Sequence, residues 1–304
     1  MEEKYRIPED KYQRLEEILQ GYGSLAVAFS GGVDSAFLLA FAWELLPGRV
    51  LALTAEAPAF PAWEQEEAVE FCRERGIPQV RVALEWGDLA GFAENPPDRC
   101  YLCKRSIFTI LKKKAEAEGF SVLADGTNGA DVLDYRPGMR ALAELGIVSP
   151  LKEAGLTKED IRPWLRRRGI SLWDKPSCAC LASRIPYGEP ITAEKLQAVD
   201  AVERFLRGRG FAQVRVRCHG AVARIEVEPA ERRRFLLEED LMELTEKAAK
   251  AAGFSFAALD LGGYRMGSLN PAEAESGAAG GRGMGPGQAA EGEETALKGC
   301  GGGL

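Results

Sequence analysis

Histidine is almost missing from this chain: His219 is the single histidine among 304 residues. Histidine is the commonest metal ligand in proteins and the usual general base of nucleophilic triads. The sequence therefore leaves no room for a histidine-rich metal site and argues against a histidine-based triad. Metal or nucleophile chemistry has to rest on other side chains, and the chain offers seven cysteines.

Long apolar runs and a positive net charge are missing too. No run of 18 apolar residues occurs, and the acidic start "MEEKYRIPEDKY" has no apolar core, so neither a membrane span nor a secretory signal is predicted. The formal net charge is -7, which argues against a nucleic-acid partner because phosphates reward a basic surface. We expect a cytoplasmic protein without a membrane or nucleic-acid partner, whose cysteines are reduced, metal-bound or catalytic.

Short apolar runs alternate with amphipathic segments in the first half of the chain. This alternation predicts an α/β domain over residues 1–170, a parallel sheet with helices on both faces. The predicted strands are 25–30, 49–55, 79–85 and 121–128, and the predicted helices are 9–20, 34–46, 62–76 and 99–119.

The second half predicts a small α+β domain over residues 171–270. It combines a proline-rich loop, helices at 192–209 and 232–253, and segments in which apolar and polar residues alternate as in half-buried strands. From residue 271 the chain is rich in glycine, alanine and glutamate, so we predict a disordered tail over 271–304.

The string "VAFSGGVDSAFL" places two glycines between a buried strand and a helix start. Gly31 and Gly32 let the backbone approach a ligand closely, and the free N–H groups of a helix N-terminus bind phosphates. Ser30 and Ser35 add hydroxyl donors, and a carboxylate at Asp34 is useful beside phosphates if Mg²⁺ bridges them. The alternative is an ordinary N-capped helix after a tight turn.

Polar residues also follow two other predicted strands. Thr54 begins "TAEAP", and Gly126 and Thr127 lie in "ADGTN" with Asp125 and Asn128. Ligands of open α/β sheets bind at the carboxyl ends of the strands, so these residues are candidates for nucleotide contacts. A strand that ends in an Asx-type turn is the alternative.

Cysteines and arginines gather in the second half. "PSCACLASRIPYG" carries Cys178 and Cys180 between the cations Lys175 and Arg184, which favour a reactive thiolate. "VRVRCHG" adds Cys218 together with two arginines on one strand face, Arg215 and Arg217, which could bind a substrate phosphate. The three cysteines could hold a [4Fe-4S] cluster with one open iron.

A second cysteine pair, Cys100 and Cys103, lies in "RCYLCK" at the start of a predicted helix. A C-x-x-C spacing is common in metal and redox sites, but two half-buried thiols are the alternative, so the role of this pair stays open.

"SGGVDS" resembles the pyrophosphate loop of the PP-loop ATP pyrophosphatases. The chain also resembles one branch of this superfamily, the ATP-dependent sacrificial sulfur transferases that make the nickel-pincer cofactor of lactate racemase. This resemblance covers about residues 10 to 270. It rests on the glycine loop together with "RCYLCK", "LADGTN", "KPSCACLASRIPYG", "VRVRCHG" and "LDLGGYRMGSLN". The resemblance implies a homo-oligomeric enzyme that adenylates pyridinium-3,5-biscarboxylic acid mononucleotide with ATP and Mg²⁺ and forms thiocarboxylates.

The resemblance also implies roles for residues. Catalytic roles fall to Asp34 and Cys180, and substrate binding to Arg184, Arg215 and Arg217. Nucleotide and pyrophosphate binding falls to Ser30, Gly31, Gly32, Asp34, Ser35, Thr54, Gly126 and Thr127.

Two sulfur carriers are compatible with the family. One-cysteine members sacrifice the sulfur of the residue that matches Cys180, whereas three-cysteine members bind a cluster; Cys178, Cys180 and Cys218 fit the cluster form, which we favour. A tRNA thiolase of the same superfamily is the alternative function, and it predicts a basic RNA-binding face.

Overall fold

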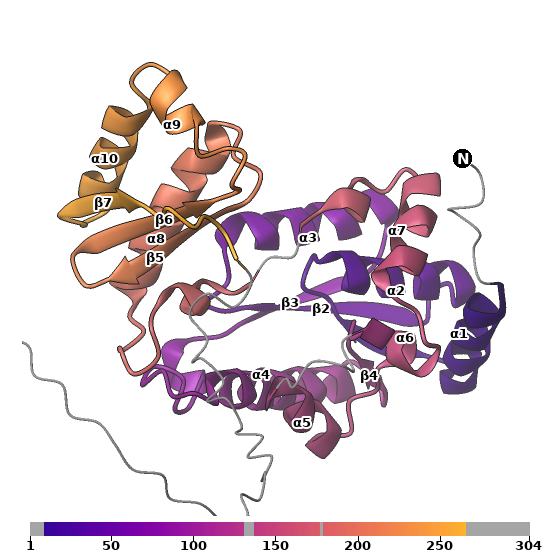
Figure 1. The fold of residues 1–304 in the computed structure, drawn as a ribbon. Coiled ribbons are helices and arrows are strands. Elements are labelled where there is room, and N and C mark those ends of the chain that lie inside the picture. The colour runs from indigo at the N-terminus through magenta and orange to yellow at the C-terminus, as the bar shows by residue number, and fades with distance from the viewer. Residues whose placement is uncertain (1–8, 131–136, 177–178, 266–304) are drawn as a thin grey trace, which may run out of the picture. The chain divides into compact units, whose positions relative to one another are not determined.

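The first sheet has four parallel strands in the order β3-β2-β1-β4 (Figure 1). The computed structural model describes residues 9–130, 137–176 and 179–265. The strands are β1 (Leu25–Ala28), β2 (Val50–Glu56), β3 (Gln79–Ala83) and β4 (Leu123–Ala124). The predicted α/β class with a parallel sheet is confirmed.

Helices cover both faces of this sheet, α2 and α3 on one face and α4 and α5 on the other (Figure 1). Successive residues of β1 point to opposite faces, so Leu25 and Val27 pack into one hydrophobic cluster and Ala26 into the other. The helices of this half are α1 (Glu9–Tyr22), α2 (Val33–Leu45), α3 (Ala62–Arg75), α4 (Arg99–Ala117), α5 (Pro137–Glu144), α6 (Pro150–Glu153) and α7 (Lys158–Arg167).

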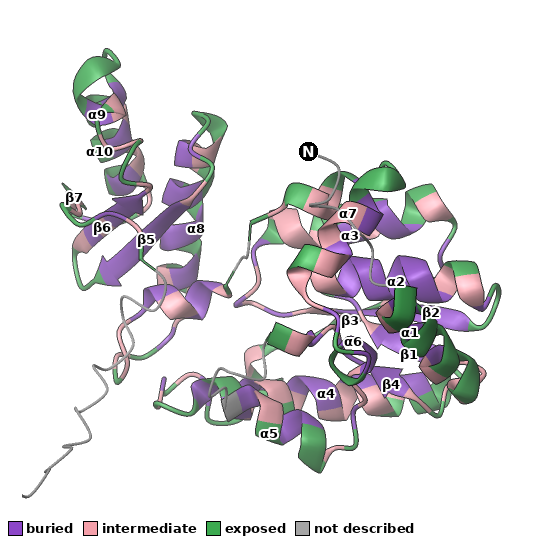
Figure 2. Ribbon diagram, turned by 45° about the vertical axis from the view of Figure 1, so that its right-hand side comes forward, coloured by how far each residue is buried: buried purple, intermediate pink, exposed green. Residues whose placement is uncertain are grey.

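The second sheet has three strands in the order β5-β6-β7, antiparallel between β5 and β6 and parallel between β6 and β7. Val214, Val216 and Cys218 of β5 join the hydrophobic core, while Arg215 and Arg217 alternate with them and are also buried (Figure 2). The elements are α8 (Ala193–Gly208), β5 (Val214–His219), β6 (Val222–Val227), α9 (Arg234–Leu237), α10 (Leu241–Ala251) and β7 (Phe256–Leu259).

Two predicted elements are wrong in extent. The predicted strand 121–128 is reduced to Leu123–Ala124, because the polar residues after it leave the sheet edge. The predicted helix 232–253 is divided into α9 and α10 at Asp240, whose φ of 64° cannot continue a right-handed helix.

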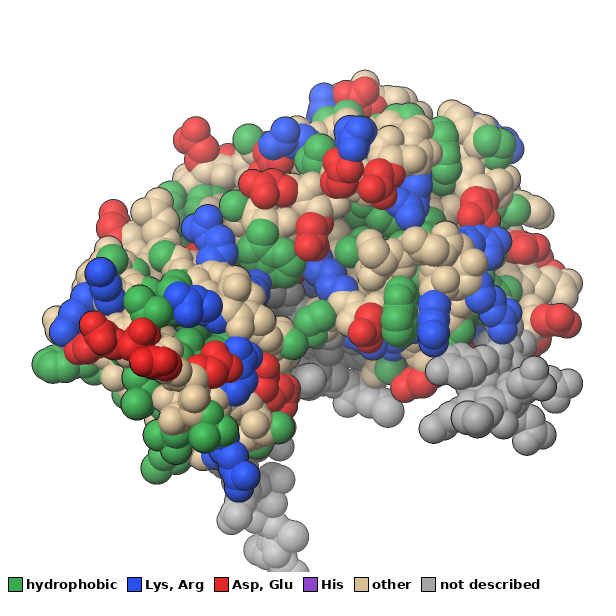
Figure 3. Space-filling view, turned by 90° about the horizontal axis from the view of Figure 1, so that it is seen from above, with side chains coloured by type: hydrophobic (Ala, Val, Ile, Leu, Met, Phe, Trp, Pro, Cys, Tyr) green, Lys and Arg blue, Asp and Glu red, His purple; other side chains and the backbone are tan. Residues whose placement is uncertain are grey.

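The described residues of both sheets belong to one compact unit. The predicted division at residue 170 stays a prediction, and the predicted disordered tail lies outside the described residues. None of the helices in the described ranges has the length and apolar character that a bilayer span requires. Figure 3 shows acidic and basic side chains interspersed on the face in view, and the expected lack of a nucleic-acid partner stays a prediction.

Candidate active site

The glycine loop lies where the sequence placed it, between β1 and α2. Gly31 has a φ of 73°, and a Cβ there would lie 3.1 Å from the carbonyl oxygen of Glu64 in α3. Gly32 is the residue before the first turn of α2, and the hydroxyls of Ser30 and Ser35 lie 3.2 Å apart beside it. The loop therefore combines a glycine at which any side chain would be strained with the N–H groups of a helix start, as a phosphate cradle requires.

Gly126, at the end of β4, packs closely against the start of α2 next to this loop. A Cβ on Gly126 would lie 2.8 Å from the backbone nitrogen of Ser35, so only glycine allows the contact. The Thr127 hydroxyl donates to the buried carboxylate of Asp125, and the Ser149 hydroxyl donates to the same carboxylate at 2.5 Å. Gly126 and Thr127 thus border the cradle, and their contact with a nucleotide stays a prediction.

Asp34 and Thr54 have partners from other elements. The Nζ atom of Lys158, at the start of α7, lies 3.8 Å from a carboxylate oxygen of Asp34. The buried Thr54 hydroxyl accepts a hydrogen bond of 2.8 Å from Gln79 of β3. Lys158 was missed from the sequence, because only the packing of α7 against α2 brings it to the loop.

Cys180 lies at the start of a 3-10 turn, Leu181–Arg184, that Arg184 holds in place. The Arg184 Nη1 group donates to the carbonyls of Ala179 at 2.6 Å and Cys180 at 3.1 Å. The other side of the same guanidinium binds Glu203 of α8 at 2.7 and 2.8 Å. Arg184 therefore fixes the backbone that carries the candidate sulfur site.

The C-x-x-C pair and Cys180 influence one another electrostatically. Burial raises the pKa of Cys103, and Cys180 and Cys100 add to the rise, while Cys100 also adds to the raised pKa of Cys180. Cys218 has different electrostatic neighbours, Lys195 and Glu189, and Cys178 lies outside the described residues. The predicted set of Cys178, Cys180 and Cys218 therefore stays a prediction, and the fold adds a second set that spacing alone left unassigned.

No group of three His, Cys, Asp or Glu side chains within the described ranges is arranged to hold a single metal ion. A four-iron cluster is much wider than one ion, so its thiolate ligands stand further apart. Cys100, Cys103 and Cys180 are free thiols, the donor type that such a cluster takes, and the predicted cluster stays a prediction.

Burial raises the pKa of the Cys180 thiol above its ordinary value of 9.0; Cys100 adds to the rise, and Arg99 and Arg184 oppose it. The ligand-free protein therefore carries Cys180 as a neutral thiol near pH 7. We expect the rate of Cys180 alkylation by iodoacetamide, followed by peptide mass spectrometry, to keep rising through pH 9. An alkylation rate that reaches a plateau near neutral pH would mean that the effect of the two arginines on the pKa outweighs that of burial. The alkylation rate of Cys180 in the unfolded protein serves as the reference.

The three candidate substrate arginines have different partners. Arg184 is fully buried against Glu203, and burial alone would raise the pKa of Glu203, but Arg184 holds it below its usual range. Arg217 binds Glu226 at 2.8 Å and the Ser183 carbonyl at 2.9 Å. Arg215 donates to the Val214 carbonyl and lines a pocket. Their role in substrate binding stays a prediction.

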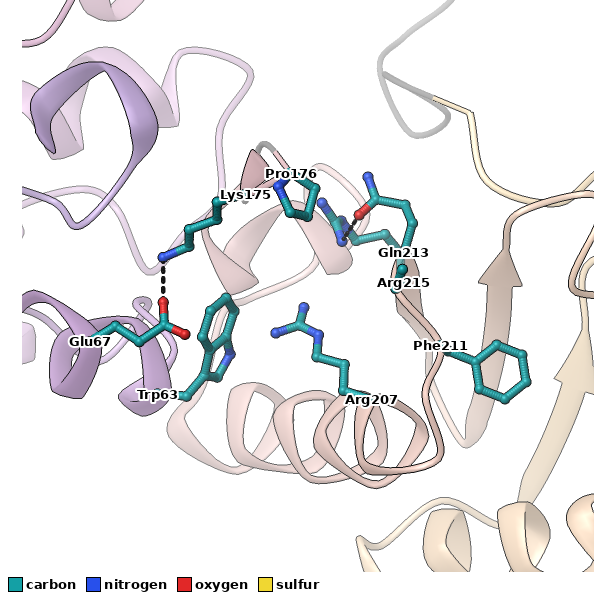
Figure 4. A pocket seen from close by; sticks show the side chains of 9 residues that line it. Trp63, Glu67, Lys175, Pro176, Arg207, Phe211, Gln213 and Arg215 are labelled. Atoms are coloured by element: carbon teal, nitrogen blue, oxygen red, sulfur yellow. Dashed lines mark hydrogen bonds and ion pairs between the residues drawn. The ribbon is translucent and has the colours of Figure 1, made fainter. Parts of the chain in front are cut away.

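Lys175 connects the glycine loop with the cysteine segment. Its Nζ group donates to the Gly31 carbonyl at 2.9 Å and to Glu67 of α3 at 2.7 Å, and its side chain is only 9% exposed (Figure 4). The sequence placed Lys175 beside Cys178 and Cys180 but gave no signal of its contact with the loop. Lys175, which precedes the cysteine segment in sequence, thus holds the glycine loop through the Gly31 carbonyl.

No protein-family model matches the chain, but curated proteins do. The pyridinium-3,5-bisthiocarboxylic acid mononucleotide synthase of Lactiplantibacillus plantarum is 35% identical over 248 residues, which cover 81% of this chain and 88% of the relative. An uncharacterized protein of Synechocystis sp. is 39% identical over 260 residues, covering 84% and 97%.

A weaker relative is the argininosuccinate synthase of Haloarcula marismortui, 29% identical over 163 residues, or 50% of this chain and 38% of the relative. This similarity fits the predicted PP-loop superfamily. Given the fold, the glycine loop and the extent of the match to the synthase, the chain belongs to the family of pyridinium-3,5-bisthiocarboxylic acid mononucleotide synthases, the sulfur transferases of nickel-pincer cofactor biosynthesis.

Proposed function

We propose that this enzyme converts both carboxylates of pyridinium-3,5-biscarboxylic acid mononucleotide to thiocarboxylates, for the nickel-pincer cofactor of lactate racemase. A carboxylate oxygen attacks the α-phosphorus of ATP, and the bond to pyrophosphate breaks. Sulfur at the sulfide level then attacks the acyl carbon: the C–S bond forms, the acyl C–O bond breaks, AMP leaves with its electron pair, and the sulfur leaves its carrier to remain in the thiocarboxylate. The observation that carries the proposal is Lys175, which joins the Gly31 carbonyl to the segment of Cys180.

The residues of the glycine loop suit the first step. The N–H groups at the start of α2 and the hydroxyls of Ser30 and Ser35 would hold the leaving pyrophosphate. Asp34 would hold Mg²⁺, which commonly binds through one or two carboxylates plus substrate phosphates and neutralises the charge of the leaving group. Gly126 would keep the end of β4 against the loop.

For the second step we propose that Cys180, together with Cys100 and Cys103, holds a [4Fe-4S] cluster. When bound, the cluster supplies an open iron that carries the transferable sulfur. The charges of these three cysteines influence one another, which supports the proposal, and the set of Cys178, Cys180 and Cys218 is the alternative that the experiment has to separate from it. Arg184 would keep the Cys180 backbone in position while the acyl adenylate is attacked.

Replacing Asp34 with asparagine tests the first step. We expect Asp34→Asn to slow pyrophosphate release by on the order of 10²–10³-fold at saturating Mg²⁺, because the carboxylate that holds the ion is lost. Asp10→Asn, an exposed aspartate of α1, is the control and should leave the rate unchanged. Near-normal pyrophosphate release by Asp34→Asn would remove this residue from the metal role.

A further inference from the structure

A pocket of about 260 Å³ lies between Lys175 and α8, and the described functions of the loop and the cysteines do not use it. Trp63 and Glu67 reach it from α3, Arg207 from α8, and Gln213 and Arg215 from the start of β5 (Figure 4). In the close view Arg207 and Arg215 direct their guanidinium groups toward the same space, and Lys175 borders it from the side of the glycine loop.

The polar lining of this pocket consists mainly of hydrogen-bond donors. Three cations, Lys175, Arg207 and Arg215, face one carboxylate, Glu67, so the lining carries a formal surplus of two positive charges. Glu67 contacts Lys175 and is 46% exposed, so solvent screens it. A site with this balance favours an anionic ligand that offers several acceptor oxygens.

Trp63 gives a second, independent indication. Its indole Nε1–H is buried and has no hydrogen-bond partner among the described residues. Such buried donors are rare in native proteins, because the group loses its hydrogen bonds to water on folding. Both cations lie over the indole ring, Lys175 at 4.9 Å and Arg207 at 4.5 Å from its centre. Figure 4 shows the Trp63 ring between these two cations, with Lys175 turned toward Glu67 and Arg207 on the side of the pocket, so an acceptor oxygen in the pocket would meet Arg207 and the N–H group.

The pocket is connected to both halves of the reaction. Lys175 donates to the Gly31 carbonyl of the glycine loop. Arg207 binds Glu203 at 3.2 Å, and Glu203 also binds Arg184, whose guanidinium holds the Cys180 carbonyl. A ligand anchored here would therefore have one end fixed next to the elements that carry the phosphate cradle and the sulfur site.

We propose that this pocket binds a phosphate monoester dianion. If the proposed function holds, on which this inference rests, the ligand is the phosphate of the mononucleotide substrate. Trp63, Arg207 and Arg215 bind the phosphate oxygens, and Lys175 stays with Glu67 at the edge of the pocket. Arg217 does not line the pocket. The reacting carboxylates of the substrate stay outside the pocket, free to reach the adenylation and sulfur sites.

Two variants test the pocket. Trp63→Phe keeps an aromatic ring for the two cations and removes only the N–H group, and Arg207→Met removes one cation. A hydrogen bond to a charged group is worth about 1.5–3 kcal/mol, so each variant should raise the dissociation constant about 10-fold or more. Arg209→Met, which removes a neighbouring cation outside the pocket, is the control for loss of charge.

The measurement is calorimetric titration of the full-length protein with nicotinamide mononucleotide, a phosphate monoester that lacks the paired carboxylates, and with inorganic phosphate. We expect both to bind the wild type and Arg209→Met, and both to bind Trp63→Phe and Arg207→Met more weakly at unchanged melting temperature. If all four proteins bind the two probes equally, or if the wild type binds neither probe, the proposal that this pocket binds phosphate is overturned.

Turnover separates this inference from the proposed function. The wild type should prefer the biscarboxylate mononucleotide over its riboside, which lacks the phosphate, and Arg207→Met should lose most of that preference through KM. A preference that survives in Arg207→Met overturns the inference. If phosphate binding responds to the variants but no thiocarboxylate forms with any substrate, the pocket stands and the proposed function fails.

Discussion

Cys180→Ala is expected to abolish both thiocarboxylate formation and iron binding, whereas Cys218→Ala should keep both. Cys100 acts electrostatically on Cys180, and both act on Cys103, whereas Lys195 and Glu189 act on Cys218. Cluster assembly needs its thiolate ligands, so Cys100→Ala and Cys103→Ala should also lose the iron. The measurement is visible absorption and iron content after anaerobic reconstitution, with repeated turnover on added sulfide.

The opposite results have equally clear meanings. Loss of iron in Cys218→Ala, with iron retained in Cys100→Ala and Cys103→Ala, would support the set of Cys178, Cys180 and Cys218 instead. A wild type that binds no iron, turns over once and becomes lighter by one hydrogen sulfide at Cys180 would decide for the sacrificial route. Cys72→Ala, another buried thiol, controls for the loss of side-chain packing.

Glu203→Leu is expected to lower the free energy of unfolding by about 3–5 kcal/mol, because it leaves a buried guanidinium without its counter-ion. Arg184 and Glu203 are 0% and 1% exposed, and the Glu203 carboxylate also accepts the backbone N–H of Val216 at 3.0 Å. Urea unfolding measures the loss. Thiocarboxylate formation by Glu203→Leu should also be lost, since Arg184 donates a hydrogen bond to the Cys180 carbonyl as well.

An exposed pair provides the matched control. Arg168 and Glu44 also join distant parts of the chain, at 2.8 Å, but their side chains are 42% and 50% exposed. Glu44→Leu should cost less than about 1 kcal/mol, because water screens such pairs. The double variant Arg184→Met/Glu203→Leu should recover part of the stability. Equal small losses for Glu203→Leu and Glu44→Leu would contradict the structural role of the buried pair.

The sequence by itself determined the parallel α/β class and the position of the glycine loop. Both depend on local patterns: apolar runs of strand length, amphipathic helices between them, and Gly31 at a place where a positive φ is required. The same local logic was wrong at Asp240, where one residue with positive φ divides a helix that composition favoured.

Only the tertiary structure decided which distant side chains meet. Cys100 precedes Cys180 by eighty residues, and Trp63 precedes Arg207 by still more, so no spacing rule relates them. The packing of α4, α3 and α8 brings these residues together, and it also gives the arginines different roles. Arg184 and Arg217 lie against buried carboxylates that desolvation would otherwise penalise, whereas Arg215 faces a pocket. In the sequence, strand alternation makes Arg215 and Arg217 equivalent, whereas their different partners in the fold distinguish them.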